Sequence, residues 1–164
     1  PRLLLKWPND LWLADGPGRG RKLGGVLIET VAIGRRRLVV MGVGLNIAPL
    51  AVPPGREFAS GFACLQELDP AASPPSALHR VALPLIRALR QFEREGFAGF
   101  TAAYARRDLL RGLSVTAQNA AGDGAIEGVV EGVSNTGALL LRVGPALREL
   151  SSGEVSVRLA GDGA

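Results

Sequence analysis

At three places in the N-terminal third of the chain, a polar side chain stands beside glycines or in a tight turn, where an anion or a metal could bind. The first place is Lys22, which stands just before Gly24 and Gly25. A lysine next to glycines can lay its ammonium on a phosphate or carboxylate, because no Cβ stands in the way. The simpler interpretation is an exposed lysine at the end of a strand, and the residues alone leave both open.

The second place is the turn at Asn9 and Asp10, which follows Lys6-Trp7-Pro8 directly. Lys6 lies in an otherwise apolar run, and a charge in a buried run needs a partner. The Asp10 carboxylate could therefore hold either Lys6 or a Mg²⁺ ion. The alternative is a plain turn, in which the Asn and Asp side chains bond to their own backbone.

The third place is an apolar segment in which Gly42, Gly44 and Asn46 alternate with larger residues. Side chains alternate along a strand, so these three share one face. Glycine inside a strand costs stability and marks the close approach of a ligand or of another backbone. A bulge, or tight packing under a helix, would explain the same pattern. The opposite face is predicted to be core and carries Val39, Met41, Val43 and Leu45.

A sheet has to position these residues, and the apolar spacing predicts one. Strands are expected over 3–7, 11–13, 22–32 and 38–47, joined as an antiparallel meander.

Details of this sheet follow from its local residues. The run Val26-Leu27-Ile28 is expected in the core. The segment Gly18-Arg19-Gly20-Arg21 is interpreted as a solvated turn, and Arg35-Arg36-Arg37 as the tip of a hairpin.

Two helices are expected to cover one face of this sheet. Apolar residues at helical spacing between Leu78 and Leu89 predict a helix that starts after an N-cap at Ser76 and runs to Arg94. A second helix is predicted over 97–110. Cys64 and His79 are expected in the core or on a helix surface, because neither has a catalytic partner near it in the sequence.

After Gly112 the pattern changes to short strands separated by turn residues. Strands are expected over 114–118, 125–134, 138–143 and 155–159, and this spacing is typical of a small β-barrel. We therefore expect an α+β fold with two domains, a mixed or antiparallel sheet with covering helices over 1–111 and a small barrel over 112–164.

The composition limits the class of protein. The chain has 164 residues, 47% of them hydrophobic, and a net charge of +4, so a buried core is expected. One cysteine and one histidine exclude an internal disulfide framework and poly-histidine zinc sites. No apolar run is long enough for a membrane span and no secretory signal is visible, so a cytoplasmic protein is expected. The basic residues are scattered without interleaved aromatics, so DNA binding by this chain is not expected.

Three motifs in this order resemble the biotin protein ligase family. They are Lys6-Trp7-Pro8-Asn9-Asp10-Leu11, Lys22-Leu23-Gly24-Gly25-Val26-Leu27-Ile28-Glu29 and Gly42-Val43-Gly44-Leu45-Asn46-Ile47. The segments 132–141 and 152–158 are similar to that family's SH3-like C-terminal domain. The resemblance implies the class II synthetase-like fold of that family, with its N-terminal part missing because a core strand begins at the third residue.

The resemblance also implies an activity. Such ligases join biotin to ATP with Mg²⁺, releasing pyrophosphate, and then transfer biotin from biotinyl-5′-AMP to a lysine of a carboxyl-carrier domain. Lys22 matches the lysine that contacts biotin and the reacting phosphate, where a fixed cation would act electrostatically. The other matched positions are Gly24, Gly25 and Gly44 against biotin, Asn9 and Asp10 beside the nucleotide and metal, Asn46 near ATP, and Lys6 and Trp7 as supports.

One departure from the family is expected to matter. The family carries a Gly-Arg-Gly-Arg-type loop upstream of the Lys-Trp-Pro-Asn-Asp motif, and this chain starts after that point. We therefore predict that the chain in isolation does not form the adenylate efficiently. A non-catalytic interaction module and a lipoate–protein ligase are the alternatives, and a homodimer is compatible with the family.

Overall fold

The computed structural model describes residues 2–51, 53, 55, 58–119, 124–151 and 155–159. Its internal contacts divide it into two compact units. The first holds Pro1–Leu4 and Asn9–Val81, and the second holds Leu5–Pro8 and Ala82–Ala164. The domain boundary between 111 and 112 stays a prediction.

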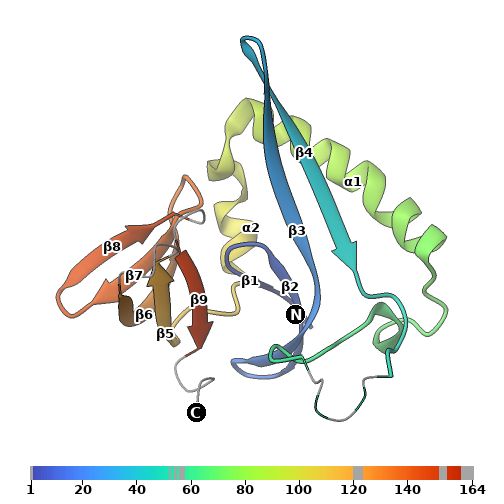
Figure 1. Cartoon of the computed structure of the whole chain (residues 1–164), viewed down its shortest axis with the longest axis horizontal. Coiled ribbons are helices and arrows are strands. Elements are labelled where there is room, and N and C mark those ends of the chain that lie inside the picture. The colour runs from blue at the N-terminus through green and yellow to red at the C-terminus, as the bar shows by residue number, and fades with distance from the viewer. Residues whose placement is uncertain are drawn as a thin grey trace. The chain divides into compact units, whose positions relative to one another are not determined.

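A four-stranded sheet carries the three polar places (Figure 1). Its order is β1-β2-β3-β4, with β1 at Leu3–Lys6, β2 at Asp10–Gly16, β3 at Arg19–Ile33 and β4 at Arg36–Leu45. The pairs β2–β3 and β3–β4 are antiparallel, which confirms the predicted meander. Ile33 pairs with Arg36 across a turn at Gly34 and Arg35, and the φ of 59° at Gly34 suits glycine. The predicted hairpin tip is thus confirmed for Arg35, whereas Arg36 and Arg37 already pair in β4.

The β3–β4 hairpin is long (Figure 1), and it exposes apolar side chains that the sequence predicts to be core. Leu27 and Val39 are each 60% exposed, and Ile28 and Val43 are exposed as well. The pairing of β2 with β3 ends at Gly25, so among the strands that the structure describes the rest of β3 pairs with β4. Alternation identified the apolar residues, but none of the described segments buries them. The buried core of this unit forms around Leu13, Leu23 and Ala63 instead.

The helices differ from their predictions at their ends. A 3₁₀ turn, η1, covers Leu65–Glu67, and the buried Cys64 precedes it. The long helix α1 covers Pro74–Glu95, so the predicted N-cap at Ser76 is wrong. Ser73 takes this place, because its carbonyl accepts the Ala77 N–H and two prolines open the helix.

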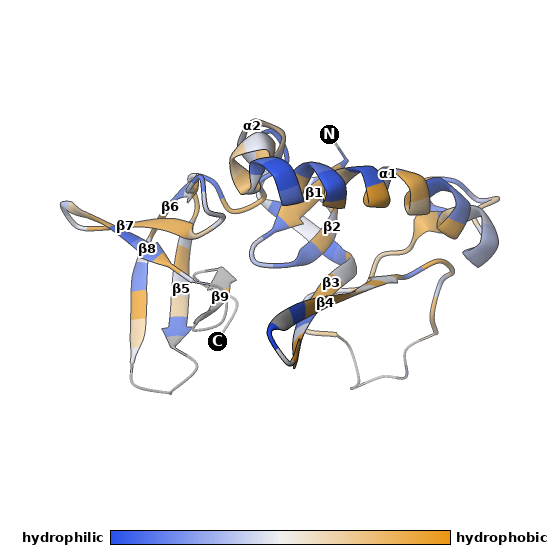
Figure 2. Ribbon diagram, turned by 90° about the horizontal axis from the view of Figure 1, so that it is seen from above, coloured by the Kyte–Doolittle hydropathy of each residue, from blue (hydrophilic) through white to orange (hydrophobic). Residues whose placement is uncertain are grey.

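The apolar side of α1 is exposed. Leu78, Ile86 and Leu89 have the predicted helical spacing, yet all three are exposed, and Ala77 is the buried residue of this helix. Bands of hydrophobic colour mark this helix in Figure 2. His79 is also exposed, which agrees with its expected place on a helix surface.

The predicted second helix breaks into a 3₁₀ turn and one short helix. η2 covers Phe97–Phe100 and α2 covers Thr101–Ala105. After α2 the backbone leaves the helix to pair with Leu5: the Leu5 N–H donates to the Arg107 carbonyl, and the Leu109 N–H donates to the Leu5 carbonyl. These bonds replace the helix predicted to continue to residue 110.

The second sheet has the strand order β8-β7-β6-β5-β9 and is antiparallel throughout. Its strands are β5 at Ser114–Asn119, β6 at Ala125–Val133, β7 at Leu139–Val143, β8 at Ala146–Leu150 and β9 at Val155–Leu159. This is the predicted small SH3-like barrel, with β8 as a strand that the turn pattern missed. Ser152, Gly153 and Glu154, quoted for the resemblance, lie outside the described residues.

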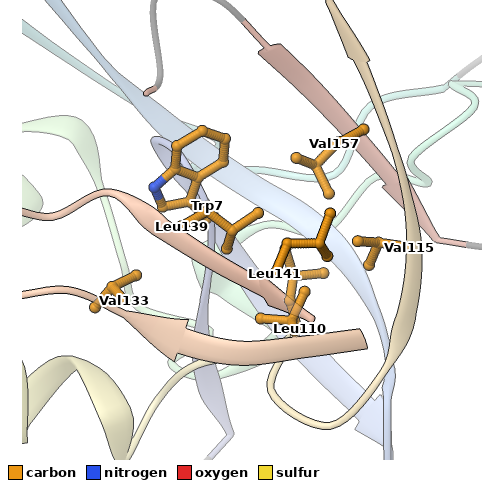
Figure 3. Close-up of a cluster of buried hydrophobic side chains, with 9 residues drawn as sticks. Trp7, Leu110, Val115, Val133, Leu139, Leu141 and Val157 are labelled. Atoms are coloured by element: carbon orange, nitrogen blue, oxygen red, sulfur yellow. The ribbon is translucent and has the colours of Figure 1, made fainter. Parts of the chain in front are cut away.

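Trp7 belongs to the core of this second unit (Figure 3). It is 4% exposed, and its indole Nε1 donates to the Gly137 carbonyl at 3.0 Å. Around it, Leu110, Val115 and Leu141 are fully buried. No helix among the described residues is long and apolar enough to cross a membrane.

Candidate functional site

An open pocket of about 450 Å³ lies on the sheet of the first unit. Its lining comes from the turn before β2 and the first residue of that strand, from β3 and from β4. The residues are Asn9, Asp10, Lys22, Gly25, Val26, Leu27, Gly42, Val43 and Gly44. A pocket of this size suits a small molecule. The sequence predicted five of these residues as binding residues, from motifs far apart along the chain.

Part of the pocket is bare backbone. Gly25 pairs with Gly44, so at this point glycines of β3 and β4 face each other, and a third glycine, Gly42, pairs with Leu27. A Cβ on Gly25 would lie 3.2 Å from Asp10 Oδ1 and 3.5 Å from the Asn9 carbonyl, inside the pocket. Absent side chains therefore leave room for a ligand against the strands.

Lys22 and Asp10 form an ion pair beside this bare surface, with Lys22 Nζ 2.6 Å from Asp10 Oδ1. Their side chains are 39% and 21% exposed. Solvent reaches the ammonium, so an incoming anion can compete with Asp10 for it. The Asp10 carboxylate thus pairs with Lys22, whereas the sequence offered Lys6 or a metal.

A β-bulge brings Lys22 to Asp10. Asp10 pairs with Gly25 and Leu11 with Gly24, but Trp12 pairs with Lys22, so Leu23 is an extra residue in β3. An extra residue switches the alternation of the strand. Leu23 is 2% exposed in the core, and Lys22 reaches the pocket beside Gly25. Strict alternation would place Lys22 on the same face as Gly24, but the bulge places it beside Gly25.

Asn9 fixes the turn that carries Asp10. Its side-chain Nδ2 donates to the Val26 carbonyl at 2.8 Å, and its own carbonyl accepts the Val26 N–H at 2.8 Å. Both bonds hold the turn against β3, so Asn9 has a structural task as well as a place in the pocket lining.

Four predicted site residues lie outside the pocket lining. A Cβ on Gly24 would lie 2.2 Å from the Gly44 carbonyl oxygen, so strand packing alone requires this glycine. Asn46 donates from Nδ2 to the carbonyls of Lys22 and Ala63, at 3.3 and 3.0 Å. Lys6 ends β1 and Trp7 is in the second core. Their parts in ligand binding stay predictions.

Arg21 was interpreted as part of a solvated turn, and this is wrong. It lies in β3, and its guanidinium binds the carboxylates of Asp15 and Glu67. The hydrogen bonds that Arg21 donates to Asp15 hold the pKa of the Asp15 carboxyl below its ordinary value. Those that it donates to Glu67 lower the pKa of the Glu67 carboxyl in the same way. No sequence signal marks this contact, because Glu67 is 46 residues away.

The donors for a metal are few. Among the described residues no group of three or more His, Cys, Asp or Glu side chains gathers, and Asp10 is the carboxylate of the pocket. Mg²⁺ is commonly held by one or two carboxylates together with substrate phosphates and water. With Asp10 as its carboxylate, the pocket offers no cage for a metal ion alone and fits a magnesium ion only where other oxygen ligands complete the coordination shell.

Comparisons with known proteins give two family matches. The model of the Biotin/lipoate A/B protein ligase family matches residues 3–46, and the model of the Biotin protein ligase C terminal domain matches residues 112–158. The chain is 31% identical over 160 residues to the bifunctional ligase/repressor BirA of Escherichia coli K12, across 97% of this chain and 47% of BirA. The chain belongs to the biotin protein ligase family.

Two further members of the family are similar to most of this chain. A biotin–[acetyl-CoA-carboxylase] ligase of Paracoccus denitrificans is 34% identical over 155 residues, which cover 91% of this chain and 60% of that protein. A solved structure of the Aquifex aeolicus biotin protein ligase in complex with biotin and ATP matches 96% of this chain and 62% of that chain, with a TM-score of 0.76 and 26% identity. The chain spans about half the length of the BirA proteins it matches.

Proposed function

We propose that this chain forms part of a biotin–protein ligase that joins biotin to ATP as biotinyl-5′-AMP and passes biotin to a lysine of a carboxyl-carrier domain. The observation that carries the proposal is the pocket itself. It sets one exposed ammonium, Lys22 Nζ, beside a bare strand surface, within a family whose members are named biotin ligases. Because those relatives are longer, the reaction is proposed for this chain together with the polypeptide that they have in addition.

Lys22 would act by charge. Adenylate formation brings the biotin carboxylate to the α-phosphorus of ATP: a carboxylate oxygen bonds to phosphorus and the bond to pyrophosphate breaks. Two anions must meet, and an ammonium held between them offsets their repulsion and the charge that builds on the phosphate. Asp10 holds that ammonium in place before either anion binds, at 2.6 Å.

Glycines in the pocket would let the substrate reach the backbone. With no Cβ at Gly25 and Gly44, a flat molecule can lie on the strands close to Lys22. Asn9 holds the turn against β3, so Asp10 keeps its position when Lys22 turns toward an anion. Gly24 and Asn46 would contribute by keeping the strand ends together.

Magnesium would accompany the nucleotide. When bound, the ion supplies positive charge to the phosphates of ATP, and Asp10 with the Asn9 amide oxygen is the donor set that this pocket offers.

The alternatives differ in their support. The family model over residues 3–46 covers both biotin and lipoate ligases, but the one over 112–158 is specific to biotin ligases. This favours biotin, and a competition between labelled biotin and lipoate would decide. If the chain is instead a non-catalytic interaction module, the signals of Lys22 should not change when an anion is added. A cytoplasmic location and a homodimer remain part of the proposal as predictions, and DNA binding by this chain is not expected.

The test is Lys22→Ala in the intact protein. Loss of one charge-assisted contact to the reacting phosphate should raise the barrier to adenylate formation by about 2–4 kcal/mol. The melting temperature should hardly change, because the Lys22 side chain is part-exposed. Arg19→Ala, an exposed cation of the same strand, is the matched control. Biotin-dependent exchange of pyrophosphate into ATP measures the step, and near-normal exchange in Lys22→Ala would refute the assignment.

The isolated chain gives a second test. It is predicted to form the adenylate poorly, because it spans 47% of BirA and 60% of the Paracoccus ligase, and the family's Gly-Arg-Gly-Arg-type loop is expected upstream of its first motif. Purified chain, Mg²⁺-ATP, labelled biotin and a carboxyl-carrier domain are sufficient reagents. Efficient labelling of the carrier domain would show that the upstream loop is dispensable.

A further inference from the structure

The guanidinium of Arg21 has every N–H donor engaged. Nε and Nη2 donate to the two carboxylate oxygens of Asp15, each at 2.9 Å. Nη1 and Nη2 donate to the two oxygens of Glu67 at 3.1 and 2.8 Å, and Nη1 also donates to the Phe62 carbonyl at 2.8 Å. Arginine has five N–H donors in a rigid fork, and all five are bonded here. We call Arg21, Asp15 and Glu67 the arginine clamp.

This clamp fastens one segment of chain to β3 at the position of Lys22. The pairing of β3 with β4 ends at Gly24 and Leu45, so Lys22 lies beyond β4. The segment from Ser60 to Ala63 takes the place of β4: the Lys22 N–H donates to the Ser60 carbonyl at 3.2 Å, and the Ala63 N–H donates to the Lys22 carbonyl at 2.9 Å. Both backbone groups of Lys22 are therefore bonded to this segment.

Gly61 shows how closely the segment lies on the clamp. A Cβ at Gly61 would be 2.6 Å from Cγ of Arg21, and its φ of 63° also favours glycine. The chain thus crosses directly over the stem of Arg21, between the Ser60 and Phe62 bonds. The guanidinium binds the Phe62 carbonyl directly after the crossing and the Glu67 carboxylate five residues further on, while the Ser60 end is bonded to the Lys22 N–H.

The side chains of Arg21 and Lys22 contact different parts of the structure although the two residues are neighbours in the sequence. Lys22 lines the pocket and contacts Asp10, whereas Arg21 is absent from the pocket lining and contacts the clamp carboxylates. Arg21 can therefore reach the pocket only through the backbone of Lys22 and the segment that it fastens.

We propose that Arg21, together with Asp15 and Glu67, is a positioning residue that fixes the Lys22 ammonium in the pocket by clamping the segment 60–63 along the open edge of β3. This proposal rests on the proposed function, because it gives Lys22 the task of holding the biotin carboxylate. Without the clamp, the backbone of Lys22 would lose two partners and its ammonium would no longer be held at one point.

The first measurement is amide hydrogen exchange by NMR on the full chain. In Arg21→Gln, the amide of Ala63 should exchange about tenfold faster, because the segment that it anchors opens locally. Arg19→Gln removes the same charge from an exposed neighbour in β3 and should leave that rate unchanged. Arg21→Lys keeps the charge but has no planar fork, so it should resemble Arg21→Gln.

The second measurement separates positioning from loss of structure. Biotin and its neutral amide, biotinamide, are titrated against each variant while the Lys22 signals are followed. If Lys22 binds the carboxylate, wild type prefers biotin to biotinamide, and Arg21→Gln should reduce this preference by about tenfold, the equivalent of one charge-assisted contact. A general loss of structure would weaken both ligands equally and leave the preference unchanged.

Glu67→Gln is the milder variant in case Arg21→Gln does not fold. It removes one clamp charge, keeps an acceptor for the Cys64 N–H and should shift both readouts in the same direction by a smaller amount. Unchanged Ala63 exchange in both clamp variants, or an unchanged preference for biotin, would overturn the proposal. If wild type shows no preference for biotin over biotinamide, the role of Lys22 in the proposed function is wrong, whatever the exchange rates show.

Discussion

Gly24 and Gly25 stand next to each other in β3, and one added methyl group should have a different effect at each. At Gly24 the new Cβ would lie 2.2 Å from the Gly44 carbonyl oxygen, about 1 Å closer than atoms of this kind tolerate. Both partners are backbone of paired strands, so relief requires the strands to separate. At Gly25 the closest atom is Asp10 Oδ1, 3.2 Å away at the end of a side chain that can move.

These contacts give the expected change in the free energy of unfolding for each variant. Overpacking of this kind costs about 1–3 kcal/mol, reduced by about 0.4–1 kcal/mol because alanine has less freedom than glycine in the unfolded chain. Gly24→Ala should therefore lose about 1–2 kcal/mol, a fall of roughly 2–8 °C in melting temperature for a chain of this length. Gly25→Ala should stay within about 0.5 kcal/mol of wild type, since its small strain and the same entropic gain nearly cancel.

Ligand affinity should show the reverse order. The Gly25 methyl would stand in the pocket, in contact with Asp10 and near Lys22, so it should weaken biotin binding by about 1–3 kcal/mol, or roughly 5- to 150-fold. Melting followed by circular dichroism and a biotin titration followed by NMR measure the two effects on the same samples. Equal loss of stability in both variants, or full biotin affinity in Gly25→Ala, would refute the division between packing and pocket.

Three further outcomes follow from the same structure. Trp7→Ala should cost about 3–5 kcal/mol in urea unfolding, because the buried indole and its bond to the Gly137 carbonyl are lost; a loss below about 1 kcal/mol would contradict its place in the core. Val39→Ala should lower the free energy of unfolding by no more than about 0.5 kcal/mol, since the side chain is exposed. A larger loss would show that Val39 is buried in a core, as the alternation predicted. Arg21 lowers the pKa values of Asp15 and Glu67, so their stabilisation is present above the ordinary carboxyl range and is lost as pH falls through the lowered values. The melting temperature of wild type should exceed that of Arg21→Gln at neutral pH, and the two should converge in acid.

Much of the pocket was predictable from the sequence. The turn at Asn9, the lysine at position 22 and the glycines of two strands were recognisable from residue type and from the resemblance, and an antiparallel meander brings them together. The predicted hairpin tip at Arg35 follows from the same pattern. These features depend on local turn chemistry and on which residues are small, and both can be read along the chain.

Other features depend on information that periodicity does not carry. The alternation identified Val39 and Leu27 as apolar, but whether a strand face is covered depends on segments elsewhere, and no described segment buries them. The contact between Arg21 and Glu67 joins residues 46 apart, and charge alone does not choose between such a partner and water. Sequence patterns of this kind find the elements and leave their long-range partners undetermined.

The bulge at Leu23 shows why the site depends on the register of a few residues. Along β3, Arg21 binds the two clamp carboxylates, Lys22 lines the pocket and Leu23 is buried in the core. Gly24 then lies against the neighbouring strand, and Gly25 lines the pocket again. Strict alternation would put Lys22 with Gly24 and away from Gly25. The extra residue lets a lysine and a bare glycine meet in one pocket while the arginine before them holds the edge of the strand. Such a site therefore requires the residue types and the irregular register together.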